Sequence, residues 1–190
     1  ERYLRPGQTV VYDAHNVEGL LRAQLLDEAH PVEADLLRGV VEAERAVGSG
    51  AGLILACSQE DLNLFHRIYG WPCNRMRVVP NGVMADSITP AMPDGRTAAR
   101  GMLGLSASEW VGIFVGSDYA PNVEAGRFIV DELAPTMPDT KFVIGGGVGS
   151  RMGAGRPNVV VTGALDDATK LAWLKACDFA VNPMFSGSGT

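Results

Sequence analysis

The sequence lacks any cluster of basic residues. Its 16 Lys and Arg residues are outnumbered by 22 Asp and Glu residues, which gives a formal net charge of −6 at pH 7. The acidic excess is shared equally between residues 1–80 and residues 81–190. Proteins that bind DNA or RNA neutralise phosphates with grouped Lys and Arg side chains. The charge pattern therefore argues against nucleic acid as a partner.

Cysteine is scarce, and long apolar runs are missing. The sequence has three cysteines, Cys57, Cys73 and Cys177, an odd number with no CxxC pair. We therefore expect free thiols in a reducing cytosol. No apolar run approaches the ~20 residues of a membrane-spanning helix, and no signal peptide is visible. These features predict a cytoplasmic protein without a transmembrane segment. The first residue, Glu1, is not Met, and both ends look like cuts within a longer protein.

The sequence does contain a regular alternation of strand and helix patterns. Short β-branched runs are expected to form strands at 9–14, 52–57, 76–79, 110–116, 141–147, 158–163 and 179–182. Helical patterns lie between them at 18–29, 33–47, 58–69, 122–134 and 167–177. Residues 84–98, rich in Pro, Asp, Ser and Thr, are expected to form a linker that runs into a short helix ending near Met102–Leu105, and this segment divides the two series. The alternation predicts an α/β fold with parallel sheets in two domains, at residues 1–82 and 83–190.

Three local signals refine these helices. Ser58, with Asp61 three residues later, predicts a weak capping box at the start of one helix. Asp166 is expected to cap the helix that begins at Asp167. The helix over 33–47 is expected to turn an apolar stripe toward the core, made of Leu36, Leu37, Val40, Val41 and Ala43.

The candidate site residues follow the strands, because ligands of open parallel sheets bind beyond the carboxyl ends of the strands. After the first strand comes "DAHNVE", in which His15 can bind a sugar hydroxyl or phosphate or transfer a proton. The alternative is that His15 is an ordinary loop residue. After the strand at 110–116 comes "GSDYAPNVEAG", in which Gly116 allows close backbone approach and Asn122 or Ser117 can cap a helix.

Three further loops are rich in small residues. "GGGVGSRMGAG" (Gly145–Gly155) is a poor dinucleotide fingerprint, and it predicts either a flexible loop over a ligand or a simple surface loop. "TGALDD" (Thr162–Asp167) can meet a base edge through its backbone. "FSGSGT" at the end of the chain offers N–H groups and hydroxyls to a diphosphate. It lacks the GxxxxGK[ST] pattern, so ATP hydrolysis is not indicated.

The order and spacing of these pieces carry a resemblance. From Val10 to Thr190 they read "YDAHNVE", "ACSQEDLNLFHRIYG", "VVPNGV", "IFVGSDYAPNVEAGRFI", "FVIGGG", "NVVVTGALDD" and "DFAVNPMFSGSGT". Together they resemble the family 4 glycosyltransferases of the GT-B fold. The resemblance implies two doubly wound, Rossmann-like domains, both incomplete here. Residues 1–82 would be the later part of the N-terminal, acceptor-side domain, and residues 83–190 the first part of the C-terminal, nucleotide-sugar domain.

The resemblance also assigns roles to single residues. His15 would contact the donor sugar and phosphate near the reacting carbon. Gly116 and Ser117 would face the donor phosphates. Gly163 and Leu165 would receive the nucleotide base through backbone groups. The loop that holds the diphosphate would consist of Ser186, Gly187, Ser188, Gly189 and Thr190.

The implied reaction moves a sugar from a UDP- or GDP-sugar to a hydroxyl acceptor, with retention at the anomeric carbon. The acceptor would be a glycan, a lipid-linked molecule or a small molecule. No metal or other cofactor is implied, in agreement with the lack of an Asp-x-Asp motif. Many members attach to membranes through a basic amphipathic surface. None is visible here, and it would lie in the part of the N-terminal domain that is missing.

The chain departs from the family pattern in three places, one of which is the missing Gly-rich loop early in the N-terminal domain. Many members carry a phosphate-binding Arg and Lys after the strand matched by 110–116, but here no basic residue occurs between Gly116 and Arg127. The phosphate charge must then be balanced elsewhere, with a Lys beyond residue 190 as one candidate. The Glu-x7-Glu pair of many members is also not found, because the Ser186–Ser188 stretch takes its first position.

Two other functions stay open. The GT-B architecture also serves nucleotide-sugar 2-epimerases, and the chain could equally be a non-catalytic nucleotide-sugar-binding remnant. Whichever function the whole protein has, we expect the 190-residue chain by itself to show no transfer activity, since the resemblance implies that part of each domain is missing.

Overall fold

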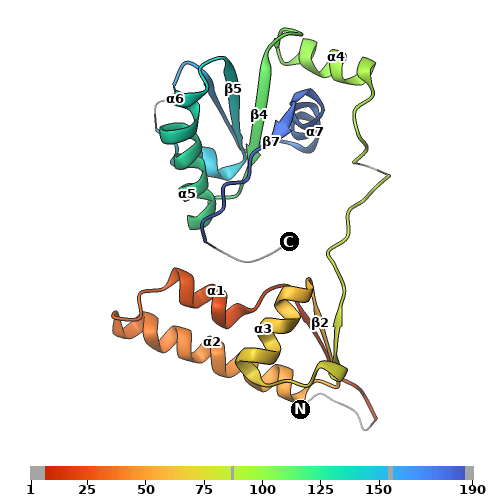
Figure 1. The fold of residues 1–190 in the computed structure, drawn as a ribbon, viewed down its shortest axis with the longest axis vertical. Helices are drawn as coiled ribbons and strands as arrows, with labels where there is room; N and C mark the ends of the chain where they lie inside the picture. Colours follow the sequence, from red (N-terminus) through yellow and green to blue (C-terminus); the bar gives the residue numbers. More distant parts are fainter. Residues whose placement is uncertain (1–6, 87, 154–155, 187–190) are drawn as a thin grey trace. The chain divides into compact units, whose positions relative to one another are not determined.

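The computed structural model describes residues 7–86, 88–153 and 156–186. These residues form two compact units, of which unit 1 extends to Gly82 and unit 2 spans Val83–Phe185 (Figure 1). Within the described residues, no helix is both long enough and apolar enough to cross a membrane. All three cysteines are free: Cys57 is buried, Cys177 is half-buried and Cys73 is exposed.

Unit 1 is built on a parallel sheet with the strand order β1-β2-β3. The strands are β1 (Val11–Ala14), β2 (Leu53–Ala56) and β3 (Met76–Val78). The connections are α1 (Glu18–Leu25), α2 (Pro31–Gly50), α3 (Gln59–Tyr69) and the short 3-10 turn η1 (Cys73–Arg75). This arrangement confirms the expected alternation, although the first helix ends at Leu25 and does not reach residue 29.

Helix α3 follows the sequence signals closely. The Ser58 hydroxyl accepts a hydrogen bond from the Asp61 amide at 3.0 Å and donates one to the Asp61 carboxylate at 2.8 Å. The helix ends at Gly70, whose φ of 69° is left-handed, a conformation that glycine adopts without steric cost. The helix buries Phe65 and Tyr69 against Trp71, with ring centroids 5.1 Å and 4.6 Å from the Trp71 ring.

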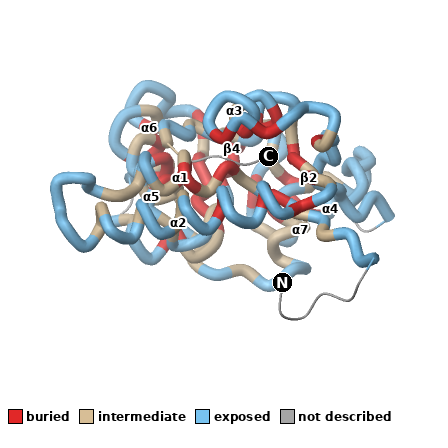
Figure 2. The backbone as a smooth tube through the Cα atoms, turned by 90° about the horizontal axis from the view of Figure 1, so that it is seen from below, coloured by how far each residue is buried: buried red, intermediate tan, exposed pale blue. Residues whose placement is uncertain are grey.

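Helix α2 differs from the expected apolar stripe. Leu36 is 54% exposed and Ala43 is also exposed, whereas the buried residues of the helix are Glu44 and Gly48. A Cβ added at Gly48 would lie 2.1 Å from the Trp71 ring, so the helix approaches the core through its glycine. The predicted stripe was wrong for Leu36 and Ala43, whereas Val41 packs against the core cluster of unit 1 as expected. The reason is that only the C-terminal half of α2 reaches the core. Figure 2 shows most of the helix exposed or half-buried.

Unit 2 contains a four-stranded parallel sheet with the order β6-β5-β4-β7. Its strands are β4 (Trp110–Val115), β5 (Thr140–Gly145), β6 (Val159–Gly163) and β7 (Phe179–Ala180). The helical segments are α4 (Pro93–Met102), α5 (Ala120–Phe128), a π-helical stretch η2 (Ile129–Leu133), α6 (Ala134–Thr136), the 3-10 turn η3 (Gly147–Arg151) and α7 (Asp167–Ala176).

Both faces of this sheet are covered. Phe114, Phe142 and Ile144 belong to a core cluster with residues of α5, η2 and α6. The alternating residues Val111, Ile113 and Val143 belong to a second cluster with residues of α4 and α7. Figure 1 accordingly shows α5 and α6 on one side of the sheet and α4 and α7 on the other. Unit 2 is therefore doubly wound, as the resemblance implied, and its strands are buried on both faces.

The strand order reverses direction at β4. From β4 the chain runs outward through β5 to β6, and it then returns to pair β7 with the other edge of β4. In doubly wound sheets a ligand binds beyond the carboxyl ends of the strands at this reversal, where the two adjacent loops lead to opposite faces. The topology therefore places a candidate ligand site at the residues that follow β4 and β7.

Two of the expected helix caps have different outcomes. Asp166 caps α7 as predicted, because its carboxylate accepts a hydrogen bond from the Thr169 amide at 2.8 Å. Neither Asn122 nor Ser117 caps α5, which begins at Ala120 with Tyr119 at the N-cap position. Asn122 lies within the helix, and its amide nitrogen donates to the carbonyl and hydroxyl of Ser117.

Candidate functional site

The candidate site residue of unit 1, His15, lies on the loop between β1 and α1. Its side chain is 68% exposed, and its Nε2 is 3.9 Å from a carboxylate oxygen of Asp13. The loop follows the carboxyl end of a parallel strand, which is the position expected for a ligand contact. An exposed imidazole at this place can donate a hydrogen bond to a ligand, but its role stays a prediction.

The loop that carries His15 is anchored by a buried carboxylate. Glu44 of α2 accepts hydrogen bonds from the amides of Glu18 and Gly19, both at 2.8 Å. These are the first two amides of α1, whose N-cap residue Val17 provides no side-chain cap. Glu44 of α2 therefore caps the N-terminus of α1, in place of a side chain at the N-cap position. Its negative charge also interacts favourably with the positive end of the α1 dipole.

Two tyrosine hydroxyls complete the surroundings of Glu44. Tyr12 donates to one carboxylate oxygen at 3.1 Å, and Tyr69 donates to the other at 2.5 Å. Burial, and then Glu44 itself, raise the pKa of both tyrosines well above the ordinary value, so the hydroxyls keep their protons. Four donors thus satisfy the buried charge. The sequence offered no signal for this anchor, because Glu44 looks like any other charged residue of an amphipathic helix.

In unit 2, a turn rich in glycine brings two of the predicted site loops together. The Gly116 amide donates to the Gly145 carbonyl at 3.0 Å, and the Gly146 amide donates to the Gly163 carbonyl at 2.7 Å. The Val148 amide then donates to the Gly116 carbonyl at 3.1 Å. The turn after β5 consequently lies between the loops that follow β4 and β6, and it contacts both through backbone atoms.

This contact requires glycine. Gly146 has φ of 91° and ψ of −173°, a region that glycine alone adopts readily, and a Cβ there would lie 2.4 Å from the Gly116 carbonyl oxygen. A Cβ at Gly149 would lie 3.1 Å from the Gly163 amide nitrogen. The two interpretations of Gly145–Gly155, a flexible loop over a ligand or a simple surface loop, were therefore wrong for its first half. That half is a tight turn packed between neighbouring loops.

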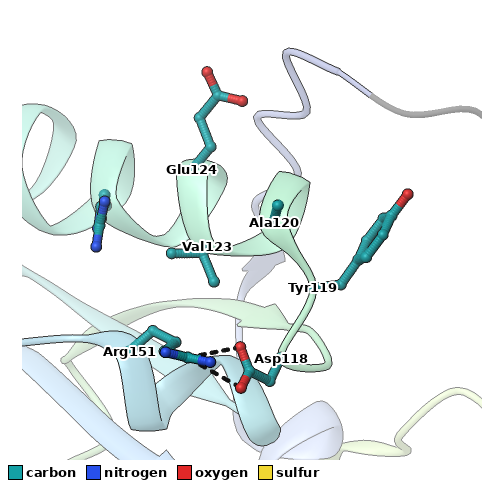
Figure 3. A pocket seen from close by; sticks show the side chains of 7 residues that line it. Asp118, Tyr119, Ala120, Val123, Glu124 and Arg151 are labelled. Atoms are coloured by element: carbon teal, nitrogen blue, oxygen red, sulfur yellow. Dashed lines mark hydrogen bonds and ion pairs between the residues drawn. The ribbon is translucent and has the colours of Figure 1, made fainter. Parts of the chain in front are cut away.

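Arg151, at the end of this turn, reaches the loop after β4 (Figure 3). Its Nε donates to both carboxylate oxygens of Asp118, at 2.9 Å and 3.0 Å. The hydrogen bonds and charge of Asp118 raise the pKa of Arg151 further. The ion pair borders a surface pocket of about 570 Å³, lined by Asp118, Tyr119, Ala120, Val123, Glu124, Arg127 and Arg151. Sequence reasoning missed this pair because the two residues lie on different loops.

The remaining predicted residues are placed as follows. Gly163 ends β6 with φ of 66°, and Leu165 is half-buried and packs against the core cluster that includes residues of α7. Ser117 follows Gly116, so both lie at the carboxyl end of β4 where the strand order reverses. Ser186 is the last described residue of the chain. The other members of the predicted diphosphate loop, Gly187, Ser188, Gly189 and Thr190, lie outside the described residues.

The described part of the chain contains no group of three His, Cys, Asp or Glu side chains arranged to hold a metal ion. The notion that the reaction needs no metal rests on the sequence resemblance alone, and it stays a prediction.

Sequence comparisons find two similar curated proteins. A D-inositol 3-phosphate glycosyltransferase of Xylanimonas cellulosilytica is 29% identical over 126 residues, which cover 65% of this chain and 28% of that protein. A D-inositol 3-phosphate glycosyltransferase of Rhodococcus erythropolis is 28% identical over 162 residues, which cover 83% of this chain and 34% of that protein. The chain thus spans about a third of the length of these relatives. No protein-family model matches it.

Structural comparisons find whole-chain likeness. WaaG, a glycosyltransferase involved in lipopolysaccharide biosynthesis, matches with a TM-score of 0.64 and 18% identity, over 92% of this chain and 50% of that one. Anabaena Alr3699/HepE, solved in complex with UDP and glucose, matches with a TM-score of 0.61 and 19% identity, over 93% and 46%. Together with the parallel, helix-covered sheets, these matches show the α/β fold of GT-B glycosyltransferases.

Proposed function

We propose that this chain is part of a glycosyltransferase that uses a nucleotide diphosphate sugar as donor. The observation that carries the proposal is the sequence similarity to D-inositol 3-phosphate glycosyltransferases, which extends over 83% of the chain in one case. The GT-B fold supports it, and the solved HepE complexes with UDP and UDP-glucose favour a UDP-sugar over a GDP-sugar. We infer that the protein acts in the cytoplasm and belongs to the retaining family 4 enzymes.

The geometry of unit 2 suits a diphosphate. The diphosphate is proposed to bind beside Gly116 and Ser117, because these residues follow β4, where the strand order reverses. The diphosphate gains negative charge as its bond to the sugar breaks. Preorganised amide donors that meet this developing charge lower the barrier more than they stabilise the ground state.

The proposed reaction exchanges one bond at the anomeric carbon for another. The bond from this carbon to the diphosphate oxygen breaks, and a bond to the acceptor hydroxyl oxygen forms on the same face of the sugar. The hydroxyl proton leaves with the diphosphate. His15, exposed on the loop after β1, would donate a hydrogen bond to the donor sugar near this carbon. Glu44 would hold that loop in place.

The test is a transfer assay on the complete protein. UDP-sugars and GDP-sugars are supplied with a panel of hydroxyl acceptors, beginning with D-inositol 3-phosphate because the two relatives are named for it. We expect nucleoside diphosphate to be released only when donor and acceptor are both present. Absence of release with every donor, together with absence of binding, would overturn the proposal. Analysis of the product by proton NMR distinguishes retention from inversion.

His15 is tested in the same assay. We expect His15→Ala to lower kcat at least about tenfold, since one hydrogen bond to the reacting sugar is lost. The matched control is His30→Ala, another exposed histidine that lies at the start of α2. Equal effects of the two substitutions would contradict the role of His15.

Two other outcomes identify the alternatives. Recovery of an isomerised nucleotide sugar without acceptor would indicate a GT-B 2-epimerase. Calorimetric binding of UDP without turnover would indicate a nucleotide-sugar-binding module. For the 190-residue chain alone we expect no transfer, because it spans only about half of the matched structures.

A further inference from the structure

The loop after β4 lacks a cation of its own, yet the structure brings one to it. No basic residue occurs between Gly116 and Arg127, so the residues at the carboxyl end of β4 cannot balance a phosphate with their own side chains. Arg151 arrives from the turn after β5, the strand directly paired with β4. Adjacent strands lie only ~4.8 Å apart, so this turn is one strand spacing from the reversal point.

The position of Arg151 is set by rigid contacts. The Val148 amide bonds to the Gly116 carbonyl, and a Cβ at Gly147 would lie 3.1 Å from the Asp118 amide nitrogen. The turn is therefore packed directly against the loop after β4, and the base of the Arg151 side chain cannot drift away from it. The freedom that remains is in the side chain itself, which is 60% exposed.

The partner of Arg151 is one that an anion can replace. Asp118 is 43% exposed, and exposed ion pairs contribute little to stability. Both hydrogen bonds to Asp118 come from Nε, so the pair does not use the four N–H groups of the two terminal nitrogens. A diphosphate carries more charge than a carboxylate and offers paired oxygens to the guanidinium fork.

We propose that Arg151 is the cation that binds the donor diphosphate, and that Asp118 holds it in the absence of donor. This inference rests on the proposed function. When the diphosphate reaches the carboxyl end of β4, Arg151 exchanges the Asp118 carboxylate for phosphate oxygens. Asp118 is then a competitor for Arg151, and its own negative charge opposes the incoming phosphate. The two residues of one ion pair are therefore expected to act on donor affinity in opposite directions.

The test compares UDP with uridine by calorimetry on the complete protein (GDP and guanosine if the wild type selects that base). We expect Arg151→Gln to weaken UDP binding about tenfold and to leave uridine binding unchanged, because only the diphosphate contact is lost. Asp118→Asn is expected to tighten UDP binding about threefold. Arg127→Gln is the matched control, since Arg127 borders the same pocket and is exposed, but lies about two turns further along α5.

The measured UDP affinities separate failure of this inference from failure of the proposed function. Equal UDP affinities of Arg151→Gln and the wild type would overturn the inference alone, and so would equal losses for UDP and uridine. If the wild type binds neither UDP nor GDP, the proposed function fails and the inference fails with it. Arg151→Lys covers the case in which Arg151→Gln does not fold. It keeps the charge but not the planar fork, and we expect intermediate UDP affinity with a native melting curve.

Discussion

The two units hold their candidate loops by different means. In unit 1, the loop after β1 is anchored by side chains, because Glu44 gathers two amides and two tyrosine hydroxyls in a buried position. In unit 2, the loops after β4 and β6 are joined by the backbone of a glycine turn, and the side-chain pair beside them is exposed. Removing a hydrogen-bond partner should therefore destabilise the buried Glu44 cluster of unit 1. Adding a side chain at a glycine should destabilise the backbone contacts of the turn in unit 2.

The largest effect is expected from adding one methyl group in unit 2. Gly146→Ala forces a residue with φ of 91° to carry a Cβ 2.4 Å from the Gly116 carbonyl oxygen. Backbone strain and overlap together are expected to lower the free energy of unfolding by about 4 kcal/mol. Urea denaturation followed by circular dichroism measures this change. Gly153→Ala is the control, since no atom lies within 4 Å of a Cβ at that position. Similar losses in both variants would show that the turn is not the anchor.

The next effect comes from removing a carboxylate in unit 1. Glu44→Ala leaves the Glu18 and Gly19 amides and the Tyr12 and Tyr69 hydroxyls without their acceptor. Water can satisfy some of them, so we expect a loss of about 3 kcal/mol in the free energy of unfolding. The same denaturation experiment on Glu42→Ala, an exposed glutamate of the same helix, is expected to show almost no change. The side-chain anchor would be refuted by equal stability of these two variants.

Gly19→Ala tests whether the side-chain anchor of unit 1 is also sensitive to an added atom, as the glycine turn of unit 2 is expected to be. A Cβ at Gly19 would lie 2.6 Å from the Tyr69 hydroxyl oxygen and 3.3 Å from a carboxylate oxygen of Glu44. The overlap displaces Tyr69 from Glu44, and we expect a loss of about 2 kcal/mol despite the better helix propensity of alanine. In a Tyr69→Phe background the loss of stability caused by Gly19→Ala should be smaller, because the Tyr69 hydroxyl oxygen that the new Cβ would overlap is absent. A double-mutant cycle measures this coupling.

The smallest effect depends on pH. Tyr69→Phe removes one hydrogen bond to Glu44, and we expect a loss of about 1 kcal/mol at pH 7. Burial and Glu44 raise the pKa of Tyr12 and Tyr69, so their contribution is complete below pH ~10 and decreases as pH rises above it. Unfolding measured from pH 8 to 11 should show this alkaline decrease in the wild type. A variant with both tyrosines replaced by Phe should show much less of it, and an unaltered slope would contradict the assignment.

Much of the fold followed from local pattern. Ser58 and Asp166 mark helix starts that the structure reproduces, because capping depends on residues close together in the chain. The apolar stripe of α2 followed only in part, since Val41 packs against the core but Leu36 is exposed and Glu44 is buried. Periodicity shows which residues share a helix face, but it does not show how far along the helix the core extends.

The candidate site was predictable in the same uneven way. The sequence points to His15, Gly116 and Gly163 because each lies at or just after the end of a strand, and strand ends are visible in the pattern. It does not reveal Glu44 beside Gly19, which are 25 residues apart, or Arg151 beside Asp118, which are 33 residues apart. These pairs exist only after the strands have been ordered in their sheets.

By itself, the sequence determined the alternation of strands and helices, the glycines at the strand ends and the net charge of −6, because these depend on composition and on neighbours along the chain. Only the tertiary structure decided which loops meet. The order β6-β5-β4-β7 places the turn after β5 against the loop after β4, and so supplies an arginine to a loop that has none of its own. The order β1-β2-β3 and the packing of α2 bring a buried carboxylate to the first amides of α1. Both contacts join residues that are far apart in the sequence, and they form only because strands pair and helices pack.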